Sequence, residues 1–160
     1  MSWLRKPKPR DVQRHRLYYA ERQVGAFLRD MLPTVPDIEN FVDHTLASRW
    51  LRTHFTPRVL DQIRVVSGRH DRFPYARGSA ISMPHWSRSK FIVIHEVAHV
   101  LCSRHYGENS IAAHGAEFAG LQVAMVTHFL REQDGLELRL AFTRFGVAHT
   151  LLGDEWSLTG

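Results

Sequence analysis

Three residues near the middle of the chain have the types and spacing of a zinc-hydrolase site. Residues 95–99 read His-Glu-Val-Ala-His, and two histidines four positions apart lie on one face of a helix. Their imidazole nitrogens can occupy two corners of a zinc tetrahedron, while the intervening carboxylate faces a water molecule beside the ion. The pattern therefore predicts His95 and His99 as metal ligands and Glu96 as a general base.

The residues around this motif predict a buried helix, because they are apolar almost all the way round it. They are Phe91, Ile92, Val93, Ile94, Val97, Ala98, Val100 and Leu101. Burying His95, Glu96 and His99 among them is costly unless something satisfies these polar groups. A metal ion would satisfy all three, and a hydrogen-bonded polar network is the alternative that needs no ion.

A catalytic zinc site normally takes a third protein ligand, and the chain offers several candidates downstream. We favour His114, because it opens the next predicted helix after a turn at Gly107, and an antiparallel return brings it back over the first two histidines. Glu117 is the alternative, either as a ligand or as a residue that orients one. His105 would lie about 240° around the helix from His99 and point away from the ion. We expect Cys102 to pack in the core.

The string HEVAH, followed by a loop and HGAEF at 114–118, resembles the SprT-like, or Spartan-type, zincin metallopeptidases, whose pattern is HExxH, a loop and HGxxF. The resemblance covers about residues 36–130, because a strand, a loop and a second strand before the helix fit the same layout. It implies that His95, His99 and His114 bind Zn²⁺ and that Glu96 is catalytic. The chain also resembles, in length and arginine-rich style, a group of uncharacterised actinobacterial metallohydrolases.

The resemblance has limits that bear on function. Many bacterial SprT-like proteins end in a cysteine zinc ribbon, which a chain with one cysteine cannot form. The DNA-targeting extensions of the eukaryotic members have no counterpart either, so the resemblance implies the metal site more strongly than a role in repairing DNA–protein crosslinks. In zincins an edge strand beside the active helix pairs with the extended substrate. Residues 80–83 would fill that role, and an ordinary buried strand is the alternative.

Hydrophobic periodicity predicts the elements that must position these residues. Helices are expected over 11–31, from about 37 to 56, over 90–106 and over about 114–131. Strands are expected at 62–67 and 80–83, joined by a loop over 68–78. Residues 136–142 alternate like a strand, but Gly146 stands where a helix would end, so we favour a short helix. The predicted fold is α+β and zincin-like, a small sheet packed against helices with the HExxH helix at the active site.

No single residue stands out as the donor that would stabilise an oxyanion. The loop over 69–72 reads Arg-His-Asp-Arg, and a histidine or arginine there could take the part, although a charged loop is more often simply solvated. His85 and Tyr106 have no better support. The serines lack the surroundings of a nucleophile, so a serine mechanism is not expected.

Composition limits the class of protein. A chain of 160 residues with 44% hydrophobic residues is expected to fold as one domain over 11–160, after a flexible basic tail over 1–10. The single cysteine excludes an intrachain disulfide framework and favours a reducing, cytoplasmic location. No apolar run approaches the roughly 18 residues of a membrane span, so no membrane partner is expected.

The net charge of the chain does not decide what kind of molecule it binds. The formal net charge is +5, which suits DNA or another polyanion, although a GC-rich coding sequence would produce the same excess of arginine. We expect a zinc metallopeptidase that acts on a protein or peptide substrate. The alternatives are a DNA-associated basic module, with a structural metal or an inactive protease, and a metallohydrolase of small amides.

Overall fold

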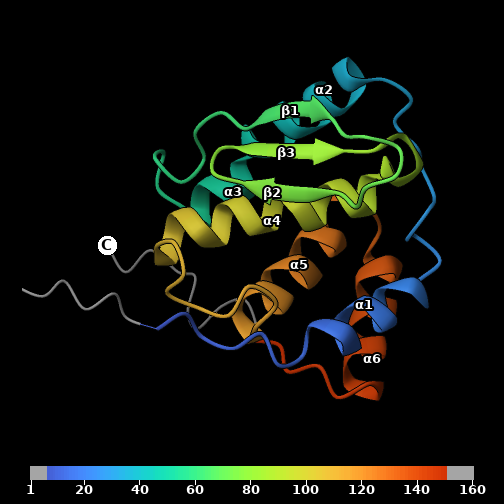
Figure 1. Cartoon of the computed structure of the whole chain (residues 1–160), viewed down its shortest axis with the longest axis vertical. Coiled ribbons are helices and arrows are strands. Elements are labelled where there is room, and N and C mark those ends of the chain that lie inside the picture. The colour runs from blue at the N-terminus through green and yellow to red at the C-terminus, as the bar shows by residue number, and fades with distance from the viewer. Residues whose placement is uncertain (1–6, 151–160) are drawn as a thin grey trace, which may run out of the picture.

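The computed structural model describes residues 7–150 and has an α+β fold, in which helices pack against one face of a small mixed sheet (Figure 1). The elements in chain order are α1 (Arg14–Arg22), α2 (Val35–Leu46), α3 (Arg49–His54), β1 (Arg64–Ser67), β2 (Tyr75–Arg77), β3 (Ala80–Met83), the 3₁₀ turn η1 (His85–Ser87), α4 (Lys90–Tyr106), α5 (Ala116–Phe129) and α6 (Glu132–Arg144). In this part of the chain, no helix is both long enough and apolar enough to cross a bilayer.

The sheet has the order β1-β3-β2. β1 runs parallel to β3, with Arg64 opposite Ala80, and β2 runs antiparallel to β3, with Tyr75 opposite Ser82. The suggestion that Ala80–Met83 is a substrate-pairing edge strand is therefore wrong, because both sides of β3 are already paired. Its isoleucine is fully buried, as expected for the alternative of an ordinary buried strand.

β2 is an edge strand of the sheet. It lies within residues 68–78, which were predicted to be a loop. It has only three residues, of which Tyr75 and Arg77 are exposed, so it carries no alternating apolar pattern. A two-residue turn joins it to β3, and Gly78 in that turn has a φ of 58°. Glycine takes this left-handed conformation without the steric cost that other residues bear.

The two N-terminal helices are shorter than predicted. The helix expected over 11–31 ends at Arg22, and the apolar spacing continues through turns whose Val24 and Ala26 are still buried. The helix expected up to residue 56 is interrupted at Ser48, whose hydroxyl accepts a hydrogen bond from the Leu51 amide at 3.2 Å and starts α3. In both segments burial continues after the helix ends, which is why periodicity alone overestimated the length.

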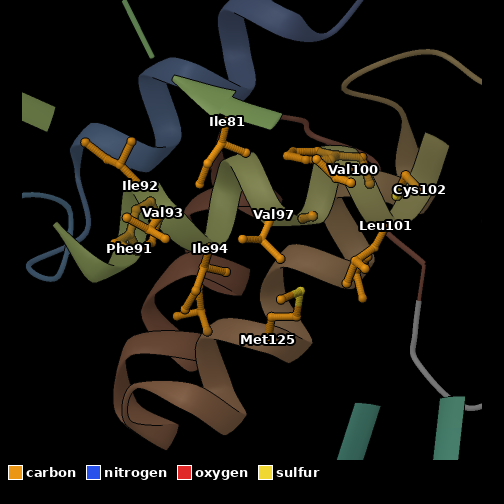
Figure 2. Packing of buried hydrophobic residues seen from close by; sticks show 14 of the residues in the cluster. Ile81, Phe91, Ile92, Val93, Ile94, Val97, Val100, Leu101, Cys102 and Met125 are labelled. Carbon is orange, nitrogen blue, oxygen red and sulfur yellow. The ribbon is translucent and has the colours of Figure 1, made fainter. Parts of the chain in front are cut away.

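Helix α4 occupies the residues predicted for it. The Ser89 hydroxyl caps its first turn by accepting a hydrogen bond from the Ile92 amide at 3.1 Å, and Gly107 ends it with a φ of 96°. The helix lies between the sheet and α5 (Figure 1). Figure 2 shows the two contacts, with Ile81 of β3 on one side of the helix and Met125 of α5 on the other.

The remaining helices form the layer behind α4. α5 packs against both α4 and α6, and α1 packs against α6 (Figure 1). Two predicted helices, over about 114–131 and at 136–142, are confirmed as α5 and α6. This packing places the N-terminal helix α1 beside the buried middle of α4, where the histidine motif lies.

Candidate metal centre

Three histidines come together where α4 meets the segment before α5. His95 and His99 lie one turn apart on α4, and His114 precedes the first residue of α5. The Nε2 atoms of His95 and His99 are 3.1 Å apart, and those of His99 and His114 are also 3.1 Å apart. Within residues 7–150 these side chains form a group that can hold a metal ion. The histidines predicted from the motif and the loop therefore do lie together.

Two of the three separations between these nitrogens are close to what a tetrahedral ion requires. Imidazole nitrogens about 2.0 to 2.1 Å from zinc lie about 3.3 to 3.4 Å from one another at the corners of a tetrahedron. The two measured separations of 3.1 Å differ from this value by only a few tenths of an ångström. These two separations suit a zinc ion, and the three ligand atoms all lie within 4.8 Å of one another.

Hydrogen bonding on the far side of two rings indicates which nitrogens face the centre. The Nδ1 atom of His95 lies 2.5 Å from Oε1 of Glu21, and Nδ1 of His114 lies 2.7 Å from Oδ2 of Asp11. Carboxylates only accept, so both Nδ1 atoms carry hydrogen. In the neutral rings, Nε2 of His95 and Nε2 of His114 then each carry a lone pair, and both lie near Nε2 of His99. A cation at the centre would take these lone pairs.

The charge state of the rings suits a cation. Burial lowers the pKa of His99 well below its usual value, and positive charge on His95 and His114 lowers it further. Burial also lowers the pKa of His114, with His95 acting in the same direction and Asp11 opposing. Burial alone would lower the pKa of His95, but the charge and hydrogen bond of Glu21 outweigh it and raise the pKa. His99 and His114 therefore favour the neutral form that binds a metal, whereas Glu21 favours the protonated form of His95, whose proton an ion would displace.

Glu96 lies next to the histidines in the same buried turn of α4. It is 4% exposed, and its Oε1 atom is 4.0 Å from Nε2 of His95. Burial raises its pKa to about 7, although His95 acts in the opposite direction. A carboxylate in this position can accept a proton near neutral pH.

Sequence reasoning missed the N-terminal residues that support the centre. Asp11, Gln13 and Glu21 lie in the segment that was predicted only as a helix, outside residues 36–130. The Gln13 amide donates to the backbone oxygen of His114 at 2.8 Å, which fixes the segment that carries this ligand. Glu21 had a readable signal, because it stands at an apolar position of the α1 stripe, four residues after the buried Leu17. Asp11 had none.

The other ligand candidates lie outside the group. Glu117 is half-buried and does not belong to the three-histidine group. The ring of His105 packs against Phe55 at 5.4 Å, consistent with the expectation that it points away from the ion. Burial raises the pKa of the Cys102 thiol, with the charge of Glu117 adding to the effect, so this residue stays protonated in the core as expected. Phe118 stacks on His99 with ring centroids 4.2 Å apart.

A cleft in two parts gives access to the centre. A smaller part, of about 350 Å³, is lined by β2 and His99, and a larger part, of about 950 Å³, is lined by α1 and His95. Four residues line both parts, namely Tyr18, Pro74, Tyr75 and Glu96. The candidate base therefore lies where the two parts meet. Of the residues considered as oxyanion donors, Arg69 and Arg72 line the larger part, whereas His70, His85 and Tyr106 line neither part.

Comparisons of this chain with protein-family models, with curated proteins and with solved structures found no match. The likeness to SprT-like zincins remains a prediction from the motif residues. The geometry of the site is therefore the basis for its functional interpretation.

Proposed function

We propose that this protein is a zinc-dependent hydrolase of the peptidase type, in which His95, His99 and His114 hold the ion. The observation that supports the proposal is that Nε2 of His99 lies 3.1 Å from Nε2 of both His95 and His114. Carboxylates are hydrogen-bonded to the far sides of the His95 and His114 rings. Three protein ligands leave one position open, as catalytic zinc sites do. When bound, zinc lowers the pKa of water and polarises a carbonyl group.

The chain's own residues divide the remaining work. Glu96 takes the proton of the attacking water and passes it to the leaving amine nitrogen. Its Oε1 atom lies 4.0 Å from Nε2 of His95, where the two parts of the cleft meet, and this position supports the role of a base. Glu21 and Asp11 hold the imidazoles of His95 and His114 with Nε2 directed inward, which keeps their lone pairs available.

The cleft favours an extended polypeptide over a small amide as substrate. Its two parts run on either side of Glu96, and β2 lines the smaller one. β2 is paired with β3 on one side only, so in the described part of the chain its other edge leaves backbone groups available. An extended peptide can add to such an edge by main-chain hydrogen bonds. A small amide would use only a fraction of this space.

A polyanion such as DNA is the second candidate partner, because arginines line the larger part of the cleft. They are Arg14, Arg22, Arg69 and Arg72. Among residues 7–150, the acidic side chains that line the same part are Glu21 and Glu96, and both belong to the metal centre. Binding of a labelled single-stranded oligonucleotide should then weaken steeply as salt increases. Weak binding that does not change with salt would contradict this second function.

The experiment that tests the enzyme measures bound zinc and cleavage of an unfolded protein such as β-casein. Glu96→Gln should keep its zinc and lose about 10²- to 10⁴-fold in turnover, because it lacks only the proton acceptor. Glu39→Gln, the same change at an exposed position, should behave as the wild type. Turnover that survives in Glu96→Gln would remove this residue from the mechanism. A wild-type protein that stays empty in stoichiometric zinc would refute the metal site.

A further inference from the structure

The hydroxyl of Tyr18 reaches the metal centre from outside the motif. Tyr18 belongs to α1, and its oxygen lies 3.1 Å from Nε2 of His114. Its ring packs edge-on against His114 with centroids 4.9 Å apart, and it lies 5.9 Å from the ring of His95. These contacts hold the half-buried side chain in one orientation beside two of the three proposed ligands.

The hydrogen bond of this hydroxyl uses the same lone pair that an ion would use. Nδ1 of His114 is bonded to Asp11, so Nε2 is the acceptor and the Tyr18 hydroxyl is the donor. An ion at the centre would take that lone pair, and Tyr18 would need another acceptor. A donor left without a partner in a half-buried position is unfavourable. The new acceptor must lie near the ion, because the ring contacts restrict how far the hydroxyl can move.

The residues that line the cleft indicate which group would accept a hydrogen bond from Tyr18 when an ion is bound. Tyr18 of α1 and Glu96 of α4 line both parts of the cleft, so both border the space where these parts meet. The guanidinium of Arg14 lies 5.6 Å from the centre of the Tyr18 ring and adds positive charge on that side. A group that becomes negative during the reaction would be stabilised at this point.

We propose that Tyr18 is a catalytic residue, which donates a hydrogen bond to the carbonyl oxygen of the scissile amide as negative charge develops on it. This inference rests on the proposed function. Water oxygen adds to the carbonyl carbon, Glu96 carries the water's proton to the leaving nitrogen, and the carbon–nitrogen bond then breaks. Tyr18 keeps its own proton throughout. Its contribution is realised in the transition state and is small when the substrate first binds.

The test compares Tyr18→Phe with Tyr19→Phe. The first variant removes the hydroxyl and keeps the ring contacts with the histidines. The second removes a hydroxyl from the adjacent residue, which is 54% exposed and packs against Phe145. Tyr18→Phe should lower kcat on a peptide substrate by about 10²-fold with little change in KM, as loss of an oxyanion donor does. Tyr19→Phe should match the wild type.

Two binding measurements separate this role from others. Zinc affinity, measured by competition with a chromophoric chelator, should not fall in Tyr18→Phe, because the hydroxyl competes with the ion for the lone pair of His114. The affinity of a peptide phosphonate, whose oxygens imitate the charged transition state, should fall by about the same factor as kcat.

Several results would overturn the proposal for Tyr18. Zinc affinity that falls tenfold in Tyr18→Phe would make Tyr18 a ligand. Equal losses in both tyrosine variants would make the effect structural. An unchanged kcat together with unchanged phosphonate affinity would remove Tyr18 from the reaction. If the wild type cleaves no peptide, the proposed function fails, and phosphonate binding by the zinc-loaded protein still tests Tyr18 separately.

Discussion

Glu21→Gln should weaken zinc binding more than any other single change that leaves the three histidines in place. Oε1 of Glu21 lies 2.5 Å from Nδ1 of His95, and its side chain is 5% exposed. The Gln122 amide also donates to this oxygen, so the carboxylate is held from two sides. Glutamine retains an oxygen acceptor and the shape of the side chain, and it removes only the negative charge.

The size of the effect follows from what the charge does. A hydrogen bond from His95 to a carboxylate is roughly twice as strong as one to a neutral amide, a difference of about 1 to 2 kcal/mol. Loss of such a supporting partner typically lowers metal affinity by about 10- to 100-fold. We therefore expect Glu21→Gln to weaken zinc binding by about tenfold or somewhat more. Asp11→Asn should cost less, about threefold, because Asp11 is 22% exposed and solvent screens its charge.

The assay is equilibrium competition for zinc against a chromophoric chelator, with circular dichroism to establish that each variant is folded. Glu39→Gln is the matched control, since it removes the same charge from an exposed position of α2. Zinc affinity in Glu21→Gln equal to that of the wild type would refute the reasoning. So would a larger loss in Asp11→Asn, because the order of the two effects depends on burial.

Two further predictions concern stability. Asp134 is buried and bonded to Arg29 at 2.5 Å and to Arg131 at 3.2 Å; burial would raise its pKa, but the two arginines outweigh it and lower the pKa. Its ionised form therefore stabilises the fold above about pH 4, and this contribution disappears as pH falls through the lowered pKa. Asp134→Asn should lose about 1 to 3 kcal/mol of unfolding free energy at pH 7 in urea titrations, and its deficit should shrink below pH 4; a constant deficit would contradict the assignment. Gly135→Ala should lower the melting temperature, because a Cβ there would lie 1.8 Å from Oγ1 of Thr127. The added methyl group would force α5 and α6 apart at a cost of about 1 to 3 kcal/mol of unfolding free energy. A variant as stable as the wild type would contradict this close packing.

The elements that local patterns describe well were predicted best. α4 has the predicted bounds, because Ser89 starts the helix and Gly107 ends it, and both signals act over a few neighbouring residues. Helix α1 was overestimated because buried side chains continue past Arg22 in turns. β2 was missed because its three residues carry no alternating apolar pattern, and it is recognised as a strand only through its pairing with β3 across the two-residue turn.

The sequence alone determined that His95, Glu96 and His99 share one part of a buried helix. The apolar residues around the motif predict the buried helix, and residues four positions apart lie on the same face of it. The choice of His114 from the downstream candidates was a prediction about how the chain returns, and the packing of α5 on α4 brings this residue to the other two. Only the tertiary structure decided that Asp11, Tyr18 and Glu21 join them. These residues lie more than 70 positions from the ligands that they contact, and no local periodicity reports a contact across that separation. Their placement depends on α1 packing beside α6 and α4, which is a property of the whole core.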